Sequence, residues 1–241
     1  MAGMTPSLTR PVALVTGASA GLGLALAHGL ADRGWSLIID ARGADALKNV
    51  ADALAAKTDV VPLAGDVTDP EHRADLVDAV GELGRLDLLV NNASYLGPSP
   101  LQRLASADLS ELRRVYEVDV VAPIALTQAL LPDLLAAAGM VLNISSDAAV
   151  EAYEGWGGYG SAKAALDHAG AVLAVEHPNL AVYAVDPGDL RTAMHQAAFP
   201  GEDISDRPEP ASVVPAFLGL LDSRPASGRY RASEFAPAVT P

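Results

Sequence analysis

The chain has 241 residues, of which half are hydrophobic, a formal net charge of −14 and no cysteine. This length suits one α/β domain with a sizeable core. The acidic charge argues against a nucleic-acid partner because no basic patch could offset it, and the lack of cysteine excludes disulfides and cysteine-ligated metal sites.

The N-terminal segment, residues 1–11, lacks an apolar run long enough for a signal peptide. The most apolar segment, residues 120–142, is interrupted by Pro123, Gln128, Pro132 and Asp133. This pattern favours a buried helix followed by a strand over a membrane span. We expect a cytoplasmic protein that has no membrane partner.

Short apolar runs bounded by turn residues alternate with helical patterns along the chain. The predicted strands are residues 12–15, 36–41, 60–64, 86–90, 139–144 and 180–185, with 229–232 as a candidate edge strand. The predicted helices are residues 24–33, 44–56, 70–83, 107–135, 159–176 and 211–221. The alternation predicts one α/β domain over residues 1–241, a doubly wound, Rossmann-type parallel sheet of six to seven strands with helices on both faces. The polar stretch 192–210 suits a substrate lid.

A glycine-rich turn joins the first predicted strand to the first helix. Its spacing, Gly17, Gly21 and Gly23, is G-x-x-x-G-x-G, which is not the commoner dinucleotide spacing, and no Gly-Lys-Ser/Thr follows as in a P-loop. Glycines let backbone amides approach a pyrophosphate, and the helix N-terminus adds positive potential. A plain glycine-rich connection is the alternative.

The end of the second predicted strand carries two residues that favour different cofactors. Asp40 could accept hydrogen bonds from a free ribose 2′-hydroxyl, which favours NAD, whereas Arg42 could pair with a 2′-phosphate, which favours NADP. Other polar clusters, Asp66, Asn91, Ser146 and the pair Pro187-Gly188, also fall at strand ends. Because the carboxyl ends of parallel strands line one crevice, we expect these clusters to converge on a ligand site.

Tyr159 and Lys163 are four residues apart in a predicted helix, which places both side chains on one face. An ammonium beside a phenol favours the phenolate and lowers the phenol pKa, so the tyrosine could exchange protons with a substrate oxygen. Ser146, 13 residues earlier at a strand end, could hold that oxygen. The alternatives are two surface residues and a serine that only satisfies backbone groups.

With these residues, the chain resembles a short-chain dehydrogenase/reductase from Val12 to about Thr192. The resemblance rests on the segment Thr16 to Gly23, Asp66-Val67, Asn91 to Ser94, Ser146, Tyr159 with Lys163, and Pro187-Gly188 with Thr192. It implies a catalytic Tyr159, a Ser146 that orients the substrate oxygen, and a Lys163 that lowers the tyrosine pKa and binds the nicotinamide ribose. The cofactor-binding residues that it implies are Gly17, Ser19, Ala20, Gly21, Leu22, Gly23, Arg42, Asp66, Val67, Asn91, Asn92, Ala93, Lys163, Pro187, Gly188 and Thr192.

The resemblance also implies the cofactor. Arg42 stands where NADP-preferring members carry a basic residue, and the acid that selects NAD would fall at Ala41, so NADP(H) is favoured and NAD(H) remains possible. Asp119 departs from the family, because it stands where the catalytic tetrad usually has asparagine. We weigh a tetrad retuned by Asp119 against an Asp119 that pairs with Arg113 or Arg114 and faces away.

The expected function is an NAD(P)-dependent oxidoreductase that transfers a hydride between a nicotinamide cofactor and a ketone or secondary alcohol. A nucleotide-binding sensor of the same fold and a sheet-based methyltransferase are the alternatives, and the second would leave Tyr159 and Lys163 without a role. The expected partners are a small carbonyl or alcohol substrate and copies of the same chain. The resemblance suggests a homodimer or homotetramer built through the long helices around Asp119 and Tyr159. Candidate pocket residues are Ser94, Tyr95, Tyr153, Trp156, Met194, His195 and Phe199.

Overall fold

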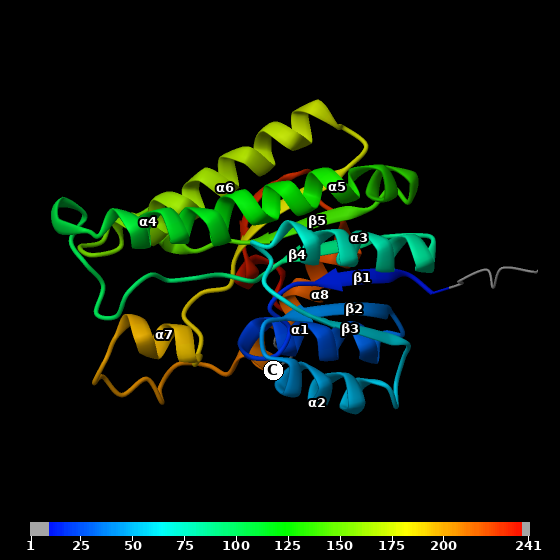
Figure 1. The fold of residues 1–241 in the computed structure, drawn as a ribbon, viewed down its shortest axis with the longest axis horizontal. Coiled ribbons are helices and arrows are strands. Elements are labelled where there is room, and N and C mark those ends of the chain that lie inside the picture. Colours follow the sequence, from blue (N-terminus) through cyan, green and yellow to red (C-terminus); the bar gives the residue numbers. More distant parts are fainter. Residues whose placement is uncertain (1–9, 238–241) are drawn as a thin grey trace, which may run out of the picture.

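The computed structural model describes residues 10–237. It contains a seven-stranded parallel sheet in the order β3-β2-β1-β4-β5-β6-β7 (Figure 1). The strands are β1 (Val12–Val15), β2 (Ser36–Ala41), β3 (Val60–Ala64), β4 (Leu88–Asn91), β5 (Met140–Ile144), β6 (Ala181–Asp186) and β7 (Gly228–Arg231). The prediction of a doubly wound parallel sheet is confirmed, and the candidate edge strand is its seventh strand.

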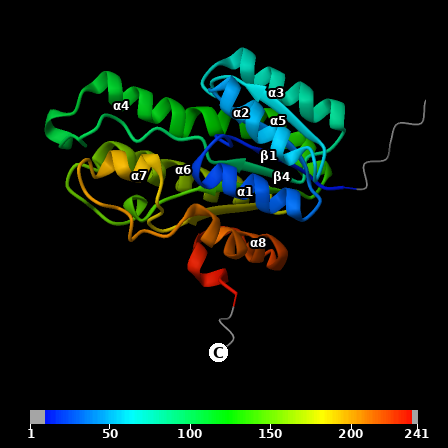
Figure 2. The same ribbon diagram turned by 90° about the horizontal axis from the view of Figure 1, so that it is seen from below.

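Helices cover both faces of this sheet. They are α1 (Gly21–Asp32), α2 (Ala44–Leu54), α3 (Pro70–Leu83), α4 (Leu109–Tyr116), α5 (Ala122–Ala136), α6 (Gly157–Glu176), α7 (Ala193–Ala198) and α8 (Val214–Ser223). One core cluster joins α1, α2 and α8 to the sheet, and a second joins α3, α5 and α6 to the opposite face. Figure 2 shows α3 and α8 on opposite sides of the strands.

Side chains that alternate between the two buried faces of the sheet explain why each strand is a continuous apolar run in the sequence. In β1, Ala13 and Val15 belong to the first cluster, whereas Val12 and Leu14 belong to the second. Successive side chains point to opposite faces, and here both faces are buried. The strand order reverses between β1 and β4, which opens a crevice at the strand carboxyl ends. Those ends face the end of the molecule that carries α4 and α7 (Figure 1).

The helix predicted over residues 107–135 is a continuous run that includes a π-helical segment, Glu117–Val121, between α4 and α5. Pro123 has no N–H to donate to the carbonyl of Asp119 four residues earlier, and the helix widens there. Among the described residues, Leu109–Ala136 is the one helix long and apolar enough to cross a membrane. Leu126, Leu130 and Leu134 bury one side of it against the sheet, as in a core helix.

Two other boundaries differ from the prediction. Helix α1 begins at Gly21 rather than at residue 24, so Gly21 and Gly23 lie in its first turn. Helix α6 begins at Gly157, two residues before Tyr159. The polar stretch 192–210 contains a short helix, α7, capped by Thr192, whose hydroxyl accepts the His195 N–H at 3.1 Å.

Candidate active site

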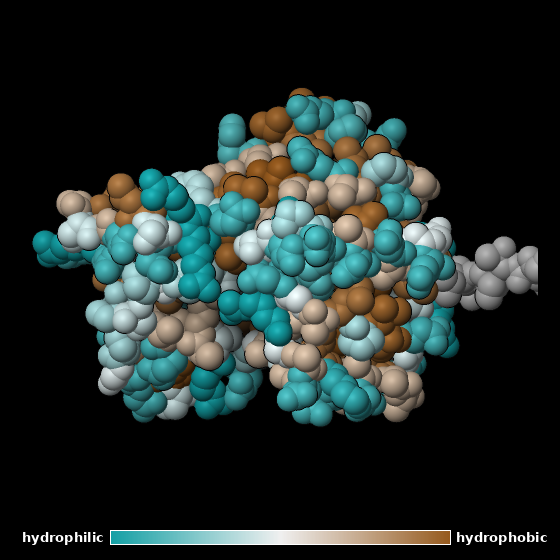
Figure 3. Space-filling view, in the orientation of Figure 1, coloured by the Kyte–Doolittle hydropathy of each residue, from teal (hydrophilic) through white to brown (hydrophobic). Residues whose placement is uncertain are grey.

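Two adjoining cavities lie at the strand carboxyl ends, and both are lined by Gly17, Arg42, Ala93 and Ser94. The first, called here the β2-side cavity, has a volume of about 570 Å³ and extends past Asp66 to α4. The second, the α7-side cavity, has a volume of about 450 Å³ and extends past Ser146 and Tyr159 to α7. Figure 3 shows a hollow between the part of the molecule that carries α7 and the part that carries α1 and α2. Of the strand-end clusters expected to converge, Asp66, Ser146 and Pro187-Gly188 line these cavities.

Tyr159 and Lys163 line the α7-side cavity from the first two turns of α6. They are 8% and 2% exposed, so neither is a surface residue. The Lys163 Nζ donates to the Ile144 carbonyl at 3.0 Å and lies 5.4 Å from the centre of the Tyr159 ring. Gly160 permits this placement of α6, because a Cβ there would lie 2.5 Å from the Ala148 carbonyl oxygen.

The charge of Lys163 acts to lower the pKa of Tyr159, as expected, but it is not the largest influence on that pKa. Burial raises the pKa of Tyr159 above its ordinary value, while the charge of Lys163 acts in the opposite direction and does not outweigh burial. Burial lowers the pKa of Lys163, but the negative charges of Tyr159, Asp119 and Asp167 outweigh it and leave that pKa raised. The lysine is therefore held as a cation beside the phenol.

Ser146 lies at the end of β5 and lines the same cavity. Its hydroxyl accepts the Ala148 N–H at 3.2 Å and donates to the Asp147 Oδ1 at 3.0 Å. The backbone role considered for this serine is therefore present, and it coexists with a place on the cavity wall. Ser145 also borders this cavity, and its hydroxyl donates to the Asp167 carboxylate at 2.7 Å.

The glycine-rich turn is shaped by close backbone contacts. A Cβ on Gly17, whose φ is +66°, would lie 2.9 Å from the Asn92 Nδ2, and one on Gly23 would lie 2.4 Å from the Gly17 carbonyl oxygen. Asn92 ties this turn to β4, because its Nδ2 donates to the Thr16 carbonyl at 2.9 Å and to the Gly17 carbonyl at 3.2 Å. Ala93, the next residue after Asn92, borders both cavities.

The N-terminus of α1 faces the α7-side cavity through Ala20, Gly21 and Leu22. No side chain caps it, and its first turn holds no acid. Asp69, Asp108 and Thr192, in contrast, cap α3, α4 and α7. Free amide N–H groups at the positive end of a helix are a ready site for a phosphate group, so this end fits the pyrophosphate of a dinucleotide.

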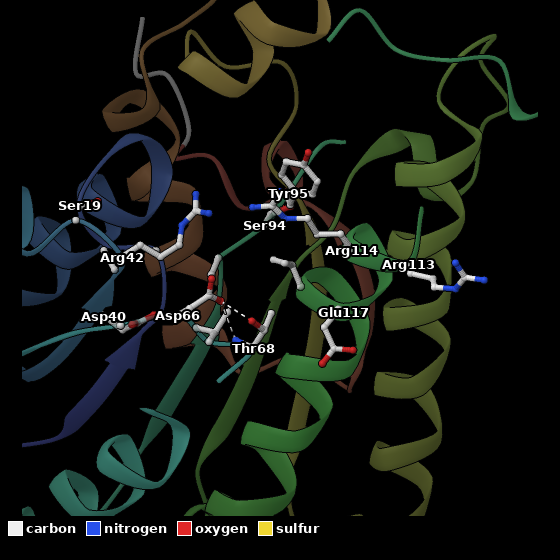
Figure 4. Close-up of a pocket in the computed structure, with 17 residues that line it drawn as sticks. Ser19, Asp40, Arg42, Asp66, Thr68, Ser94, Tyr95, Arg113, Arg114 and Glu117 are labelled. Atoms are coloured by element: carbon white, nitrogen blue, oxygen red, sulfur yellow. Dashed lines mark hydrogen bonds between the residues drawn. The ribbon is translucent and has the colours of Figure 1, made fainter. Parts of the chain in front are cut away.

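Arg42, Ser19, Asp66 and Val67 line the β2-side cavity, as the cofactor assignment requires (Figure 4). The Asp66 carboxylate accepts the Thr68 N–H at 2.9 Å and the Thr68 hydroxyl at 2.8 Å. Burial would raise the pKa of Asp66, but these hydrogen bonds outweigh it and leave the pKa lowered. In Figure 4, Arg42 reaches toward the space in front of Asp66, whereas Arg113 extends away from it.

The remaining assigned residues divide into two groups. Pro187, Gly188 and Thr192 line the α7-side cavity with Trp156, Met194 and His195. Asn91 lines neither cavity, which corrects its assignment to the cofactor. It is the last residue of β4, so alternation turns it into the core, where its Nδ2 donates to the Asn143 Oδ1 at 2.8 Å.

The structure also corrects the pocket residues. Tyr153 lines neither cavity, and its hydroxyl lies within hydrogen-bond distance of the Asp147 and Glu151 carboxylates. Phe199 packs behind the cavity wall against Trp156 and His195. Sequence reasoning missed Asp147, which lines the α7-side cavity directly after Ser146. Its position next to a strand-end serine was the available signal.

Asp119 faces the interior, in the π-helical segment. It is 1% exposed, its Oδ1 accepts the Tyr95 N–H at 2.8 Å, and its Oδ2 has no partner. Burial raises the pKa of Asp119, and the charge of Lys163 opposes this. No arginine within residues 10–237 pairs with Asp119, and Arg114 instead lies over the Tyr95 ring at 4.6 Å. The pairing with Arg113 or Arg114 is therefore absent, and Asp119 is buried in the interior without lining either cavity.

Comparison with known proteins agrees with this architecture. Residues 11–203 match the short chain dehydrogenase family. An uncharacterized oxidoreductase of Mycobacterium tuberculosis is 34% identical over 208 residues, which cover 84% of this chain and 78% of the relative. The sepiapterin reductase of Rattus norvegicus is 35% identical over 201 residues, which cover 78% of this chain and 77% of the relative.

A solved structure has the same fold. It is a short chain dehydrogenase of Shigella flexneri complexed with NADP, with a TM-score of 0.86 and 31% identity, and the match covers 92% of this chain and 97% of that one. The fold, the sequence match and the two cavities at the strand ends lead to one conclusion: this chain belongs to the short chain dehydrogenase family of oxidoreductases.

Proposed function

We propose that the protein transfers a hydride between NADP(H) and a ketone or secondary alcohol, with Tyr159 as the acid/base. The observation that carries the proposal is that Tyr159, Lys163 and Ser146 line one cavity together with the uncapped N-terminus of α1. One wall thus offers a proton donor, and the adjoining wall offers a phosphate site. No metal is needed for this chemistry.

The dinucleotide would lie across both cavities. Its pyrophosphate would be held at the α1 N-terminus by the turn from Gly17 to Gly23, and its adenine by Asp66 and Val67. Lys163, Pro187, Gly188 and Thr192 would hold the nicotinamide half. When bound, the nicotinamide supplies or accepts the hydride, and the protein supplies position and protons.

Each polar side chain then has a distinct task. The Ser146 hydroxyl orients the substrate oxygen, the Tyr159 hydroxyl donates a proton to that oxygen in reduction, and the Tyr159 phenolate accepts one in oxidation. Lys163, held as a cation, stabilises the phenolate that forms in reduction. Trp156, Met194 and Leu96 make the rest of the cavity apolar, which excludes water from the reacting atoms.

Two observations support NADP(H) over NAD(H). Arg42 lines the β2-side cavity and carries no ion pair among the described residues, so its guanidinium is available to a 2′-phosphate. Asp40, the candidate acceptor for a free 2′-hydroxyl, is 1% exposed and bonded to His72. The Shigella flexneri relative complexed with NADP adds weight to the same choice.

We further propose a homodimer or homotetramer that assembles through α5 and α6. Large apolar side chains are exposed along this pair of helices, at Leu135, Val172 and Val175, and at Val121 directly before α5. Val175 is 82% exposed. A second copy of the chain that covers them would remove this apolar surface from water.

The test is a turnover assay. The purified protein is mixed with NADPH or NADH and a panel of ketones, and with NADP or NAD and the corresponding alcohols, and the absorbance of the reduced nicotinamide is followed. Turnover that favours NADP(H) is the expected result. Tight cofactor binding with no turnover of any substrate would support the sensor alternative instead.

A further inference from the structure

A buried carboxylate–imidazole pair lies at the β2-side cavity, away from Tyr159 and the substrate. Asp40 is the penultimate residue of β2, and His72 lies in the first turn of α3. The His72 Nε2 and the Asp40 Oδ1 are 2.6 Å apart, and the two residues are 6% and 1% exposed. Asp40 lines the cavity together with Arg42, so the pair forms part of the wall where a 2′-phosphate would lie.

The loop after β3 is shaped to hold this imidazole. A Cβ on Gly65 would lie 2.2 Å from the His72 Nδ1 and 2.3 Å from its Cγ, so any larger residue at 65 would displace the ring. The Gly65 N–H donates to the Ala41 carbonyl at 3.1 Å, which fixes the loop to the end of β2. The ring is thus clamped between β2, α3 and the loop, with Asp40 as the partner of its Nε2.

A carboxylate and a neutral imidazole together carry one negative charge. One further proton on the pair brings its net charge to zero. Burial raises the pKa of Asp40, and the hydrogen bond that the His72 ring donates to Asp40 raises the pKa of His72, so both effects favour a proton on the pair. Other charged groups that face it are Asp66 after β3, Asp69 and Asp75 at the start of α3, and Arg42 after β2. Loss of the proton would add a negative charge to the wall beside Arg42.

We propose that His72 is the positioning residue that sets cofactor specificity, because it holds Asp40 in a neutral pair. While paired, Asp40 is withheld from the 2′-hydroxyl of NAD(H) and does not repel the 2′-phosphate of NADP(H). The inference rests on the proposed function and adds a residue of α3 to the specificity determinants. Arg42 attracts the phosphate, and His72 removes the charge that would oppose it.

Two substitutions separate charge from shape. His72→Gln keeps a hydrogen-bond donor for Asp40 but removes its ionisable partner, so a negative charge on the carboxylate is no longer balanced. Asp40→Asn keeps a hydrogen-bonding partner for His72 and removes the charge. The double variant D40N/H72Q is neutral again, and it is the matched control for the shape of the glutamine.

The dissociation constants of NADPH and NADH are measured at pH 8 by the fluorescence of the reduced nicotinamide. We expect H72Q to weaken NADPH relative to NADH by about tenfold, the effect of one unscreened charge several ångströms from the phosphate. D40N and D40N/H72Q should both keep the preference of the parent. A ratio in H72Q equal to that of the parent would overturn the inference and leave the pair with a role in stability alone.

The pH dependence gives a second readout that uses the parent and D40N. Between pH 7 and pH 9.5 the 2′-phosphate stays ionised, because its second pKa is about 6. Once the pH exceeds the pKa of the pair, which the partnership with Asp40 raises above the ordinary value of histidine, the pair loses its proton and NADPH binding by the parent should weaken relative to NADH. The same ratio should stay flat in D40N, and a parallel change in both proteins would refute the inference even if H72Q does not fold. Failure of the proposed function would differ, because the parent would then bind neither cofactor, or bind one without turnover of any substrate, whatever the binding ratio in H72Q.

Discussion

The two cavities of the crevice are built in different ways. The β2-side cavity is polar and takes its shape from strand ends and turns, with Arg42, Asp66 and Thr68 held by the sheet and the loop that follows it. The α7-side cavity is mostly apolar, and much of its wall comes from α7 and the segment before α6, through Trp156, Met194 and His195. The shape of the β2-side cavity follows from strand ends and turns, which can be recognised in a sequence. The shape of the α7-side cavity depends on how loop side chains pack.

This difference predicts where substitutions act. A change in the β2-side cavity should alter the affinity and choice of the dinucleotide and leave the chemical step intact. A change in the part of the α7-side cavity that holds Ser146 and Tyr159 should alter the chemical step. Lys163 touches both functions, because it lies beside the phenol and on the surface assigned to the nicotinamide ribose.

Tyr159→Phe should have the largest effect. It removes the hydroxyl that exchanges the proton and keeps the buried ring, so turnover should fall by ~10²–10⁴-fold while cofactor affinity stays near that of the parent. Steady-state rates and a fluorescence titration with NADPH measure the two quantities. Turnover within a few-fold of the parent would remove Tyr159 from the catalytic role.

Lys163→Ala should lower both the rate and the cofactor affinity. The buried ammonium is lost from beside the phenol and from the cavity wall together. Lys163→Met is the control for the space that alanine leaves, because it fills most of that space without the charge. If only the rate changed in both variants, the contact with the ribose should be abandoned.

Arg42→Ala should change only the affinity for the dinucleotide and leave the chemical step intact. Loss of a charged, bidentate contact with the 2′-phosphate should weaken NADP(H) by about 1.5–3 kcal/mol, with little change for NAD(H). Arg103→Ala is the control, because this exposed arginine lines neither cavity and pairs with Glu154. Tighter binding of NAD(H) than NADP(H) by the parent would contradict the assignment of Arg42.

Asp119→Asn should produce a smaller change, in pH dependence rather than in rate. The negative charge of Asp119 raises the pKa of Tyr159, so its removal should lower that pKa. Oxidation needs the phenolate, and the alkaline side of its pH–rate profile should move to lower pH while activity is kept. Superimposable profiles would show that Asp119 does not communicate with Tyr159.

Val175→Asp should leave the chemistry unchanged and affect only assembly. A charge on this exposed position of α6 should weaken the proposed contact between copies, which light scattering would report as a lower molar mass. Val150→Asp, at an exposed valine outside α5 and α6, is the control. Equal masses for all three proteins would place the interface elsewhere.

The sequence predicted most of the fold and the polar half of the site. Apolar runs located the strands, because both faces of the sheet are buried, and the glycine spacing located the turn at α1. Asn91 was misassigned because its direction depends on the last residue of β4 and on its register with Asn143 of β5. Periodicity does not reveal such pairings across strands.

Other features depend on contacts distant in sequence. The pairing of Asp40 with His72 joins residues 32 apart on different elements. The π-helical segment has nearly the same apolar pattern as the α-helix around it, and only Pro123 signals the change. The net pKa shift of Tyr159 depends on its burial, which a spacing of four residues from Lys163 does not disclose.

The uncapped N-terminus of α1 has a consequence for the lifetime of the protein. In the free protein its amides lack a side-chain partner, so an anion that binds there stabilises the folded state but not the unfolded chain. A cofactor at 100 times its dissociation constant would add about 2.7 kcal/mol to the free energy of unfolding. Resistance to proteolysis would then rise and fall with the nucleotide pool, so the amount of enzyme that a cell retains would follow the supply of its own cofactor.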